Sequence, residues 1–448
     1  MIKQQGQILP VILFGAALLS LTMLAVFNTS QLSSKKQRLN NAADAAAYSA
    51  AVLQARHLNS LAYTNRAMIA NQVFIAQMVS IESYLNFLDV KTGNLQNIHP
   101  IGVFFTPINK VIQGVRAVSG TVATVAVDAS LAANSLFADR QRLVTNSFVG
   151  GNEIRNTAER VLAANDPDIE ITPDFGETWL AESVARWGGY FEHKNTNDDL
   201  IAKAKMINDS RDPFSAERDY SPEVVTETFK VEKKGETVLT WEENGDDISF
   251  RWDALDILSI LRKKGWFGGW ELLTPVAWSR RSISEDNTKF ACPPEDLDCE
   301  DDDRHGLTRQ AATAFQNETL NPLQNFKLQS YYELKEDVVK DPRFPVKLAV
   351  QYKKSRIKTS DNIDGLGSPA AGTNNSNELG PGLFHQESDR NFDEMISVAR
   401  AEVYFRRYED REDGADEFAN IWNPYWSARL VDNTLERAAV LTAKGVNL

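Results

Sequence analysis

The sequence has few residues that could catalyse a reaction or bind a metal. It contains only two cysteines, and its five histidines follow none of the spacings typical of metal sites. It also lacks the G-x-S-x-G, HExxH and P-loop motifs. We therefore expect no enzyme activity and no cofactor. The histidines are His57, His99, His193, His305 and His385.

Basic residues are outnumbered by acidic ones. The chain has 48 Lys and Arg against 61 Asp and Glu, which gives a net charge of −13. A protein that binds nucleic acid needs a basic surface to neutralise phosphates, so nucleic acid is not an expected partner. With 448 residues, the chain is long enough for one or two domains with hydrophobic cores.

Charged residues are absent from residues 8–27, ILPVILFGAALLSLTMLAVF. As a helix with a rise of ~1.5 Å per residue, this run matches the ~30 Å hydrocarbon core of a bilayer. The alternative is a cleaved secretory signal, which would need a shorter apolar core followed by an A-x-A site, and no such site follows Phe27. The run predicts an uncleaved transmembrane anchor within residues 1–30.

Glycine and proline are absent between Ala16 and Thr92, so no local signal ends a helix there. Alanines are concentrated at residues 42–51 and favour a helix, because alanine loses no side-chain entropy. Farther along, an apolar stripe at helical spacing predicts that this helix packs against a partner. The stripe consists of Phe74, Met78, Ile81, Leu85 and Leu88.

A second long helix is predicted to start near Pro107, after Gly93, His99 and Pro100 have ended the first. Its apolar residues follow a 3-4 repeat over five heptads, the spacing of a helix that packs along another helix. We predict that residues near 107–148 run antiparallel to residues near 40–90 and form a helical stalk within residues 31–208. The repeat consists of Ile108, Val111, Val115, Val118, Val122, Val125, Ala129, Ala132, Leu136 and Leu143.

Shorter elements are predicted after the stalk. Gly150 and Gly151 are expected to end the second helix, and residues 153–165 and 178–193 to form short amphipathic helices. Residues 224–231 and 237–241 flank Lys233-Lys234-Gly235-Glu236, a pattern typical of a hairpin with glycine in the turn.

Residues 209–448 predict an α+β domain with an antiparallel sheet. Further strands are expected at residues 248–252, 346–358 and 396–408, and a helix closed by glycines at residues 252–270. Residues 282–306 are acidic and residues 360–391 are rich in Gly, Ser, Asn and Pro, so both are expected to be mobile loops.

The cysteines Cys292 and Cys299 lie close together in an acidic stretch. This pair fits a small local disulfide, which persists outside the cytoplasm. Two unpaired thiols are the alternative, and a zinc site is poorly supported because His305 is the only imidazole nearby.

The charges beside the apolar run place the C-terminal part on the other side of the membrane from the one that a disulfide would require. Lys35, Lys36 and Arg38 follow the run, whereas only Lys3 and the terminal amine precede it. The positive-inside rule alone would therefore place the C-terminal part in the cytoplasm. The residues themselves leave the orientation open.

The N-terminal region resembles TadE/TadG-like proteins of tight-adherence (Flp-type) pilus assembly systems. In that family Gly-Gln or Gly-Glu precedes the apolar span, and a short basic segment leads into a helix of the form LQNAADAAALA. Here Gly6 and Gln7 precede the span, and the matching helix residues are Leu39-Asn40-Asn41-Ala42-Ala43-Asp44-Ala45-Ala46-Ala47. Residues 401–430 also resemble the C-terminal segment of a TadG-related group.

The resemblance implies a non-enzymatic, single-pass protein of the bacterial inner membrane whose C-terminal domain is periplasmic. The resemblance therefore favours the periplasmic location that a disulfide requires over the cytoplasmic location that the positive-inside rule predicts. Processed prepilin-like members carry Glu five residues after the cleavage-site Gly, where this chain has Val11. A TadG-like, unprocessed anchor is the better match. The implied partners are the lipid bilayer and other pilus-assembly or envelope proteins, with homo-oligomerisation left open.

Three acidic patterns could in principle bind a cation. Asp128-Ala129-Ser130 resembles the start of the D-x-S-x-S motif of von Willebrand A domains, but Ala132 replaces the second Ser and the segment belongs to the heptad stripe. Asp166, Asp168, Glu170 and Glu177 mimic four positions of an EF-hand, although Ile171 occupies the glycine position. A solvated loop is favoured for the third pattern, which consists of Glu295, Asp296, Asp298, Glu300, Asp301, Asp302 and Asp303.

Aromatic residues gather near the C-terminus, where Trp422, Tyr425 and Trp426 precede a final predicted helix. Core packing is favoured for this group over an interaction surface. The leading hypothesis is thus a membrane-anchored envelope protein that acts through protein contacts. An extracytoplasmic sensor that binds a ligand or cation, and a hydrolase with an unfamiliar site, are the alternatives.

Overall fold

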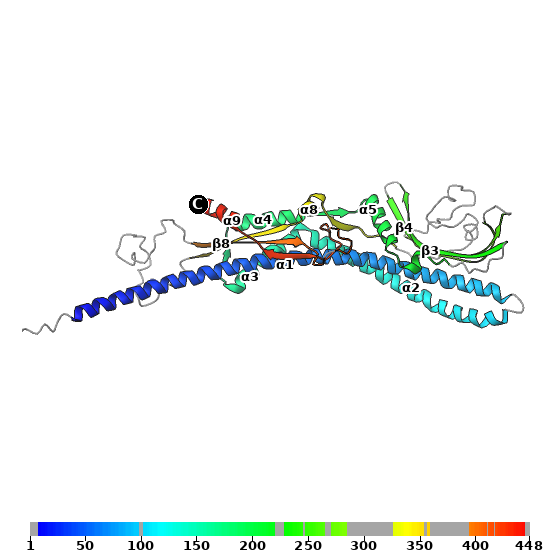
Figure 1. The fold of residues 1–448 in the computed structure, drawn as a ribbon, viewed down its shortest axis with the longest axis horizontal. Coiled ribbons are helices and arrows are strands. Elements are labelled where there is room, and N and C mark those ends of the chain that lie inside the picture. Colours follow the sequence, from blue (N-terminus) through cyan, green and yellow to red (C-terminus); the bar gives the residue numbers. More distant parts are fainter. Residues whose placement is uncertain are drawn as a thin grey trace, which may run out of the picture. The chain divides into compact units, whose positions relative to one another are not determined.

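The computed structural model describes residues 8–97, 102–219, 228–244, 247–264, 270–284, 326–353, 356–358, 394–409, 411–415 and 417–443. The fold class is α+β, as predicted, with two long helices followed by antiparallel sheets (Figure 1). Gly6, Gln7, Cys292 and Cys299 lie outside the described residues, as do residues 285–306 and 360–391 of the two expected loops.

The described elements occur in the following order along the chain. They are α1 (Ile8–Gln96), α2 (Gly102–Thr145), α3 (Ser147–Asn165), β1 (Glu170–Ile171), α4 (Phe175–Gly188), β2 (Phe191–Lys194), α5 (Asn197–Asp209), α6 (Pro213–Ala216), β3 (Phe229–Asn244), β4 (Asp247–Lys263), β5 (Trp270–Ser284), β6 (Tyr331–Leu334), α8 (Glu336–Lys340), β7 (Phe344–Lys353), β8 (Glu394–Phe405), β9 (Trp426–Leu430) and α9 (Thr434–Ala443).

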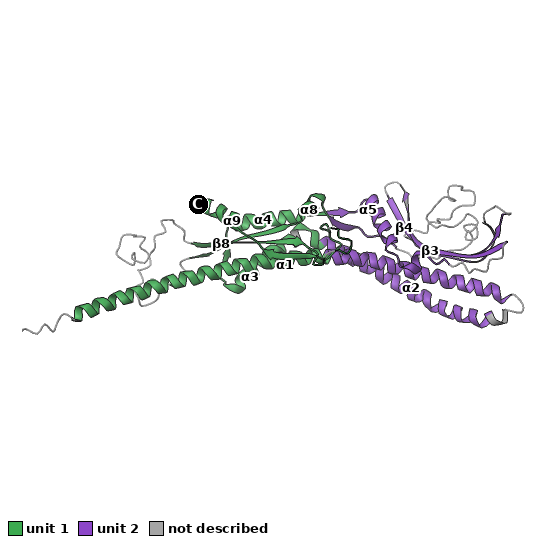
Figure 2. Ribbon diagram, in the orientation of Figure 1, with its two compact units in different colours: residues 1–60, 143–191, 334–448 green, residues 61–142, 192–333 purple. Residues whose placement is uncertain are grey.

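The chain forms two compact units, each assembled from separate segments (Figure 2). Unit 1 comprises Met1–Ser60, Leu143–Phe191 and Leu334–Leu448, and unit 2 comprises Leu61–Arg142 and Glu192–Glu333. Helix α1 therefore supplies residues to both units. The domain boundaries expected near residues 30 and 208 come from sequence texture and stay a prediction.

Unit 1 is built on an antiparallel sheet with the order β1-β7-β8-β9. Because successive side chains on a strand point to opposite faces, Tyr352 and Ala349 of β7 face different layers. Tyr352 receives Lys35 of α1 over its ring, whereas Ala349 packs with Trp179 of α4 and Val440 of α9. The sheet thus lies between α1 on one side and α4 with α9 on the other. The strands expected at residues 346–358 and 396–408 are confirmed as β7 and β8.

The side chain of Trp187 is fully buried in unit 1 and packs closely on Gly150, while Val184 packs closely on Gly151. Its indole Nε1 donates to the carbonyl of Val144 at 2.9 Å, and its ring packs on Phe344. A Cβ on Gly150 would lie 2.4 Å from that carbonyl and 2.6 Å from Nε1. The prediction that Gly150 and Gly151 end a helix is wrong, because both lie inside α3, where close packing requires them.

In unit 2, α1 and α2 pack against each other in antiparallel directions, as predicted. The side chains of Thr92 and Asn109 hydrogen bond at 2.8 Å, and Asn71 donates to Asn134 at 2.9 Å. Nearer the other end, Gln141 donates to Thr64 at 2.9 Å. Residue numbers rise along one helix as they fall along the other, which confirms the antiparallel pair.

The predicted contact surface of α2 is wrong, however. The face of α2 that packs against α1 and the rest of unit 2 carries five buried residues: Asn109, Ala123, Val127, Ser130 and Asn134. The heptad stripe lies on the opposite side, and its large residues from Ile108 to Leu136 are between 48% and 68% exposed. Two residues of the stripe expected on α1, Phe74 and Ile81, are also exposed at the margin of the packing surface. Hydrogen-bonded polar pairs hold the two helices together, whereas apolar packing through the 3-4 repeat was expected.

Strands β3, β4 and β5 form the antiparallel sheet of unit 2, with β4 in the centre. The helix predicted at residues 252–270 is wrong, because residues 252–263 belong to β4. A central strand is buried on both faces and reads as a continuous apolar run, which periodicity alone does not distinguish from a buried helix. Trp252 packs in the core with Ile75 of α1 and Ile207 of α5.

The hairpin predicted at residues 224–241 is also wrong. Residues 233–236 lie in the middle of β3, and Gly235 pairs with Asp256 of β4. A Cβ on Gly235 would lie 2.3 Å from the Asp256 carboxylate, so glycine is needed there for close approach and not for a turn.

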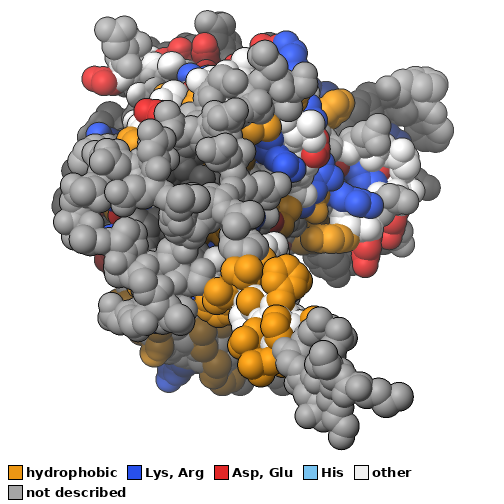
Figure 3. Space-filling model, turned by 90° about the vertical axis from the view of Figure 1, so that its left-hand side faces the viewer, with side chains coloured by type: hydrophobic (Ala, Val, Ile, Leu, Met, Phe, Trp, Pro, Cys, Tyr) orange, Lys and Arg blue, Asp and Glu red, His pale blue; other side chains and the backbone are white. Residues whose placement is uncertain are grey.

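Two helices of the described part are long and apolar enough to cross a membrane by length and composition. The first candidate lies near the start of α1, and no residue of its most apolar window is buried. Figure 3 shows hydrophobic side chains gathered on the face of the molecule where α1 begins. The second candidate lies in α2, with a lower mean hydropathy of 1.3 against 2.3. The exposed apolar start of α1 agrees with the anchor predicted at residues 8–27.

Candidate interaction site beside the N-terminal motif

The alanine-rich motif lies on the part of α1 that packs into unit 1. Ala42 and Ala43 have no exposed surface, Asp44 and Ala45 are partly buried, and Asn41 is exposed. The buried alanines recur one turn apart as Ala46, Ala47, Ala50 and Ala51, all with no exposed surface. Small side chains at this spacing let neighbouring backbone approach closely. The motif is therefore a packing surface along one face and is open to solvent on the other.

Basic residues between the apolar run and the motif fix α1 to unit 1. Lys35 Nζ donates to Asp166 Oδ2 at 3.1 Å, and Arg38 lies 3.7 Å from the same oxygen. Burial opposes charge on both Lys35 and Asp166. Interactions with Tyr352 and Asp166 outweigh this effect for Lys35, and the Asp168 amide and Lys35 outweigh it for Asp166. As a result, the pKa of Asp166 is lowered and the pKa of Lys35 is raised. The ion pair therefore favours the docked position of α1.

A pocket of about 430 Å³ lies beside the motif. Helices α1 and α9 and the start of β8 line it, so it is formed entirely within unit 1. Its lining residues are Lys36, Asn40, Asp44, Glu394, Ile396, Ser397, Val398, Asn433, Arg437, Val440 and Leu441. Asn40 and Asp44 belong to the motif segment, which places family-motif residues at a concave surface.

Hydrogen bonds hold the first residues of β8 at the wall of this pocket. Ser397 Oγ and Asn40 Oδ1 lie 2.7 Å apart, and Asn433 Nδ2 donates to the Val398 carbonyl at 2.6 Å. Lys36 Nζ donates to the carbonyl of Ile396. The wall is thus preformed by contacts that link α1, β8 and the turn before α9.

The electrostatics of the pocket are those of a partly desolvated site with both signs of charge. Burial and the neighbouring Arg437 lower the pKa of Lys36, and burial raises the pKa of Asp44. No histidine or cysteine is among the lining residues, and the hydroxyl of Ser397 is engaged with Asn40. The pocket therefore offers ionic and apolar contacts for binding but no nucleophile with an adjacent base.

The aromatic residues near the C-terminus occupy different environments. Trp426 is buried, its ring contacts Phe405, and its backbone N–H and C=O bond the side chain of Asn59. Tyr425 is partly buried against Phe405, and Trp422 is partly buried. Trp426 therefore joins α1 to the sheet of unit 1, while Trp422 and Tyr425 retain exposed surface.

The acidic residues considered for a cation engage separate partners. Asp168 pairs with Arg356 and Glu177 with Arg155, while Asp166 pairs with Lys35. Asp128 lies on the exposed side of α2. Within the described ranges, no three His, Cys, Asp or Glu residues are grouped as metal ligands. The acidic residues from Glu295 to Asp303 lie outside those ranges.

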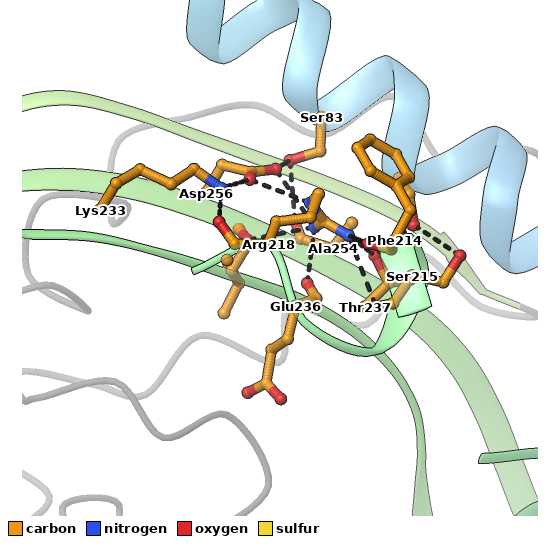
Figure 4. A network of polar contacts seen from close by, with 12 residues as sticks. Ser83, Phe214, Ser215, Arg218, Lys233, Glu236, Thr237, Ala254 and Asp256 are labelled. Atoms are coloured by element: carbon orange, nitrogen blue, oxygen red, sulfur yellow. Dashed lines mark hydrogen bonds and ion pairs between the residues drawn. The ribbon is translucent and has the colours of Figure 1, made fainter. Parts of the chain in front are cut away.

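Unit 2 contains a buried ionic network that sequence reasoning missed (Figure 4). Asp256 has no exposed surface, and its carboxylate accepts from Arg218 at 3.0 and 3.2 Å, from Lys233 at 2.6 Å and from Ser83 at 2.7 Å. The β3–β4 pairing, α1 and the segment after α6 bring these four residues together. In the sequence, the only sign of the site is that the mainly apolar run of residues 252–261 contains two aspartates, Asp253 and Asp256. Because protein groups surround the carboxylate, the network stabilises the fold and offers no binding space.

Lys203 of α5 is a second buried cation that was not predicted from the sequence. Its Nζ donates to the carbonyl of Gln329 at 2.7 Å and lies 5.2 Å from the centre of the Tyr331 ring. Burial lowers the pKa of Lys203 to about 7. Its position among backbone and aromatic groups is that of a packed core residue.

Residues 6–55 match a family model described as putative Flp pilus-assembly TadE/G-like. No curated protein matches the chain, and no solved structure matches it. The match covers the apolar start of α1 and the buried alanine motif, and it confirms the resemblance that these residues indicate.

Proposed function

We propose, from the match of residues 6–55 to the TadE/G-like Flp pilus-assembly family, that this chain is a TadG-like, non-enzymatic component of a pilus or related envelope assembly. In this role it is anchored in the bacterial inner membrane by a single span at residues 8–27, with its C-terminal part in the periplasm. Its activity consists of contacts with other envelope proteins and between its own copies.

One observation carries this proposal. The exposed apolar helix of residues 8–27 continues without interruption into the motif, whose alanine face is fully buried in unit 1. An apolar helix exposed over its whole circumference is stable in lipid and costs free energy in water. Direct continuation fixes unit 1 to the anchor without a flexible linker, as a scaffold requires.

We propose the pocket beside the motif as a contact site for an envelope partner. Its apolar residues, two cations and two anions suit a protein segment with apolar and charged side chains. The same proposal places Cys292 and Cys299 in the oxidising periplasm, where they would form a disulfide.

The anchor is tested by washing membranes from expressing cells with alkaline carbonate. The full-length protein is expected to stay in the pellet, because an apolar span is retained when peripheral proteins are released. A variant with Leu13→Lys and Leu19→Lys, two exposed positions in the span, is expected to appear in the supernatant. Release of the unmodified protein would contradict membrane anchoring.

The partner site is tested with a photo-crosslinking amino acid in cells expressing the protein at native level. Placed at Leu441 in the pocket, it is expected to capture pilus-assembly or envelope proteins. Placed at Asp337, an exposed residue of α8, it serves as the matched control. Equal capture at both positions would remove the pocket from the proposal, and piliation unaffected by deleting the gene would contradict the pilus function.

A further inference from the structure

The pocket beside the motif lies close to the bilayer, and this position carries an inference that rests on the anchor proposed above but not on the pilus role. Phe27 ends the apolar run, and Lys36 follows nine residues later on the uninterrupted helix α1. At ~1.5 Å per residue, Lys36 starts about 13 Å beyond the span, whereas the headgroup layer on each side of a bilayer is roughly 5–8 Å thick. Because a long side chain on a helix points back toward the N-terminus, the Lys36 ammonium extends toward that layer.

Strand β8 brings a carboxylate to the same end of the pocket. Ser397, near the start of β8, bonds Asn40, whereas Trp426, which pairs with the end of β8, bonds Asn59. Strand β8 and helix α1 therefore run in the same direction. Glu394 is the first residue of β8 and lines the pocket, so it belongs to the end nearer the membrane.

Two cations without a carboxylate partner line this pocket. Lys36 Nζ donates to the carbonyl of Ile396, and burial and Arg437 lower its pKa, as expected for a cation that lacks a neighbouring acid. Within the described ranges, neither Arg437 nor Glu394 forms an ion pair. A ligand with a negative group for the two cations and a positive group for Glu394 would satisfy all three side chains.

The edge of β8 adds backbone donors to the two cations. Each residue of an antiparallel strand directs its N–H and its C=O to the same edge. The carbonyls of Ile396 and Val398 accept from Lys36 and Asn433 at the pocket, so the N–H groups of Ile396 and Val398 face the pocket too. Strand β9 pairs with β8 only at residues 401–405, and no other described strand covers these N–H groups. Backbone N–H groups beside Lys and Arg are the donors that bind phosphate oxygens.

We propose that the membrane-facing end of this pocket binds the headgroup of a phospholipid that carries a phosphate and a primary ammonium group, as phosphatidylethanolamine does. The phosphate accepts from Lys36, Arg437 and the N–H of Ile396, and the ammonium donates to Glu394. The acyl chains stay in the bilayer, so the bound lipid holds unit 1 at a fixed depth. A headgroup is small, and it leaves the apolar lining residues free for the protein partner proposed above.

The first test measures lipid binding to the full-length protein in detergent by native mass spectrometry with added phosphatidylethanolamine. One lipid per chain is expected to be retained. Lys36→Gln and Arg437→Gln are each expected to raise the dissociation constant about 5- to 20-fold, because each removes a charged donor to the phosphate. Lys36→Arg keeps the charge and is expected to retain the lipid, which separates loss of binding from loss of folding.

Arg38→Gln is the matched control for these substitutions. It removes one charge from the same basic segment, but Arg38 is exposed and does not line the pocket. Its dissociation constant is expected to equal that of the unmodified protein. Equal weakening by Arg38→Gln and Lys36→Gln, or no weakening by Lys36→Gln, would overturn the proposal.

The headgroup is tested by exchanging the lipid. Phosphatidylcholine keeps the phosphate but has no N–H on its nitrogen, so it is expected to bind less tightly than phosphatidylethanolamine, and Glu394→Gln is expected to abolish this difference. Tighter binding of phosphatidylglycerol than of phosphatidylethanolamine would overturn the role of Glu394. Soluble phosphoethanolamine or inorganic phosphate bound as tightly as the lipid would overturn the membrane source of the ligand.

Extraction of the protein directly from membranes separates this inference from the proposed function. Protein that stays in the carbonate-washed pellet but retains no lipid at the pocket would overturn the lipid site and leave the anchor. Release of the protein by carbonate would overturn both. A polypeptide retained in place of the lipid would also overturn the lipid site, and it would support the protein partner.

Discussion

Replacing Asp256 by Asn is expected to open the β3–β4 pairing of unit 2 without changing its shape. Asn keeps the volume of the side chain but removes the charge that faces Arg218 and Lys233, whose side chains are 2% and 6% exposed. Burial already lowers the pKa of Lys233, and Asp256 is the main group that opposes this shift. The substitution therefore leaves two cations in a desolvated site without the carboxylate that contacts both of them.

The cost follows from known behaviour of buried ion pairs. Removing one partner of a buried pair destabilises by about 3–5 kcal/mol, because the remaining charge is uncompensated. Since 1.36 kcal/mol corresponds to a factor of ten, the lower figure makes opening of the surrounding hydrogen bonds about 150-fold more frequent. The effect should be local, because all four members of the network belong to unit 2.

Hydrogen exchange followed by mass spectrometry on the full-length protein in detergent measures this opening segment by segment. Peptides from β3 and the matching part of β4 are expected to exchange at least about 150-fold faster in Asp256→Asn, while peptides from β7 and β8 are unchanged. Asp247→Asn is the matched control, since Asp247 lies on the same strand and is exposed. Protection in β3 equal to that of the unmodified protein would refute the assigned role of the carboxylate.

Three further predictions concern stability, and thermal unfolding of the full-length protein checks each of them. Burial raises the pKa of Glu236 to about 7, so the folded state holds a proton that the unfolded state releases near pH 4.5. The free energy of unfolding is therefore expected to fall by up to about 3 kcal/mol as pH rises from about 4.5 to 7. Glu236→Gln should reduce that fall, and equal pH profiles of the variant and the unmodified protein would contradict the prediction. Gly150→Ala should destabilise despite the better helix propensity of alanine, because its Cβ would meet backbone, whereas Gly93→Ala should be neutral or stabilising by up to about 1 kcal/mol. Ala46→Leu overpacks the buried face of the motif and should cost about 1–3 kcal/mol, against no loss for Tyr48→Leu on the exposed face, and equal melting of the two variants would place the motif outside the packing surface.

Periodicity and composition predicted the helices well and the central strands poorly. Absence of glycine and proline between Ala16 and Thr92 predicted α1, because a helix continues where no residue stops it. Gly235 and residues 252–263 were misread, since a glycine required for close approach resembles a turn glycine and a strand buried on both faces resembles a buried helix. Those distinctions depend on contacts between segments far apart in the chain.

The α2 stripe shows the same limit in a different form. The 3-4 repeat correctly predicted a helix and an antiparallel partner, but the partner in α1 meets the other face through polar residues such as Asn109 and Asn134. Hydrophobic spacing indicates that a face will be covered and does not say by which helix. For the site, the alanines of the motif predicted a helix but not that one face of it is buried, and the pocket beside the motif depends on β8 and α9, about 350 residues later.

The nested order of the segments has a consequence for synthesis. Unit 2 is complete once residue 333 has been made, whereas unit 1 needs β8, β9 and α9 from the last part of the chain. Strand β7 emerges before β8 exists to pair with it, and until then the alanine face of α1 has only part of its covering. Unit 2 can therefore fold while unit 1 is still incomplete, so a ribosome that stops short of β8 leaves the alanine face of α1 uncovered and accessible to proteases.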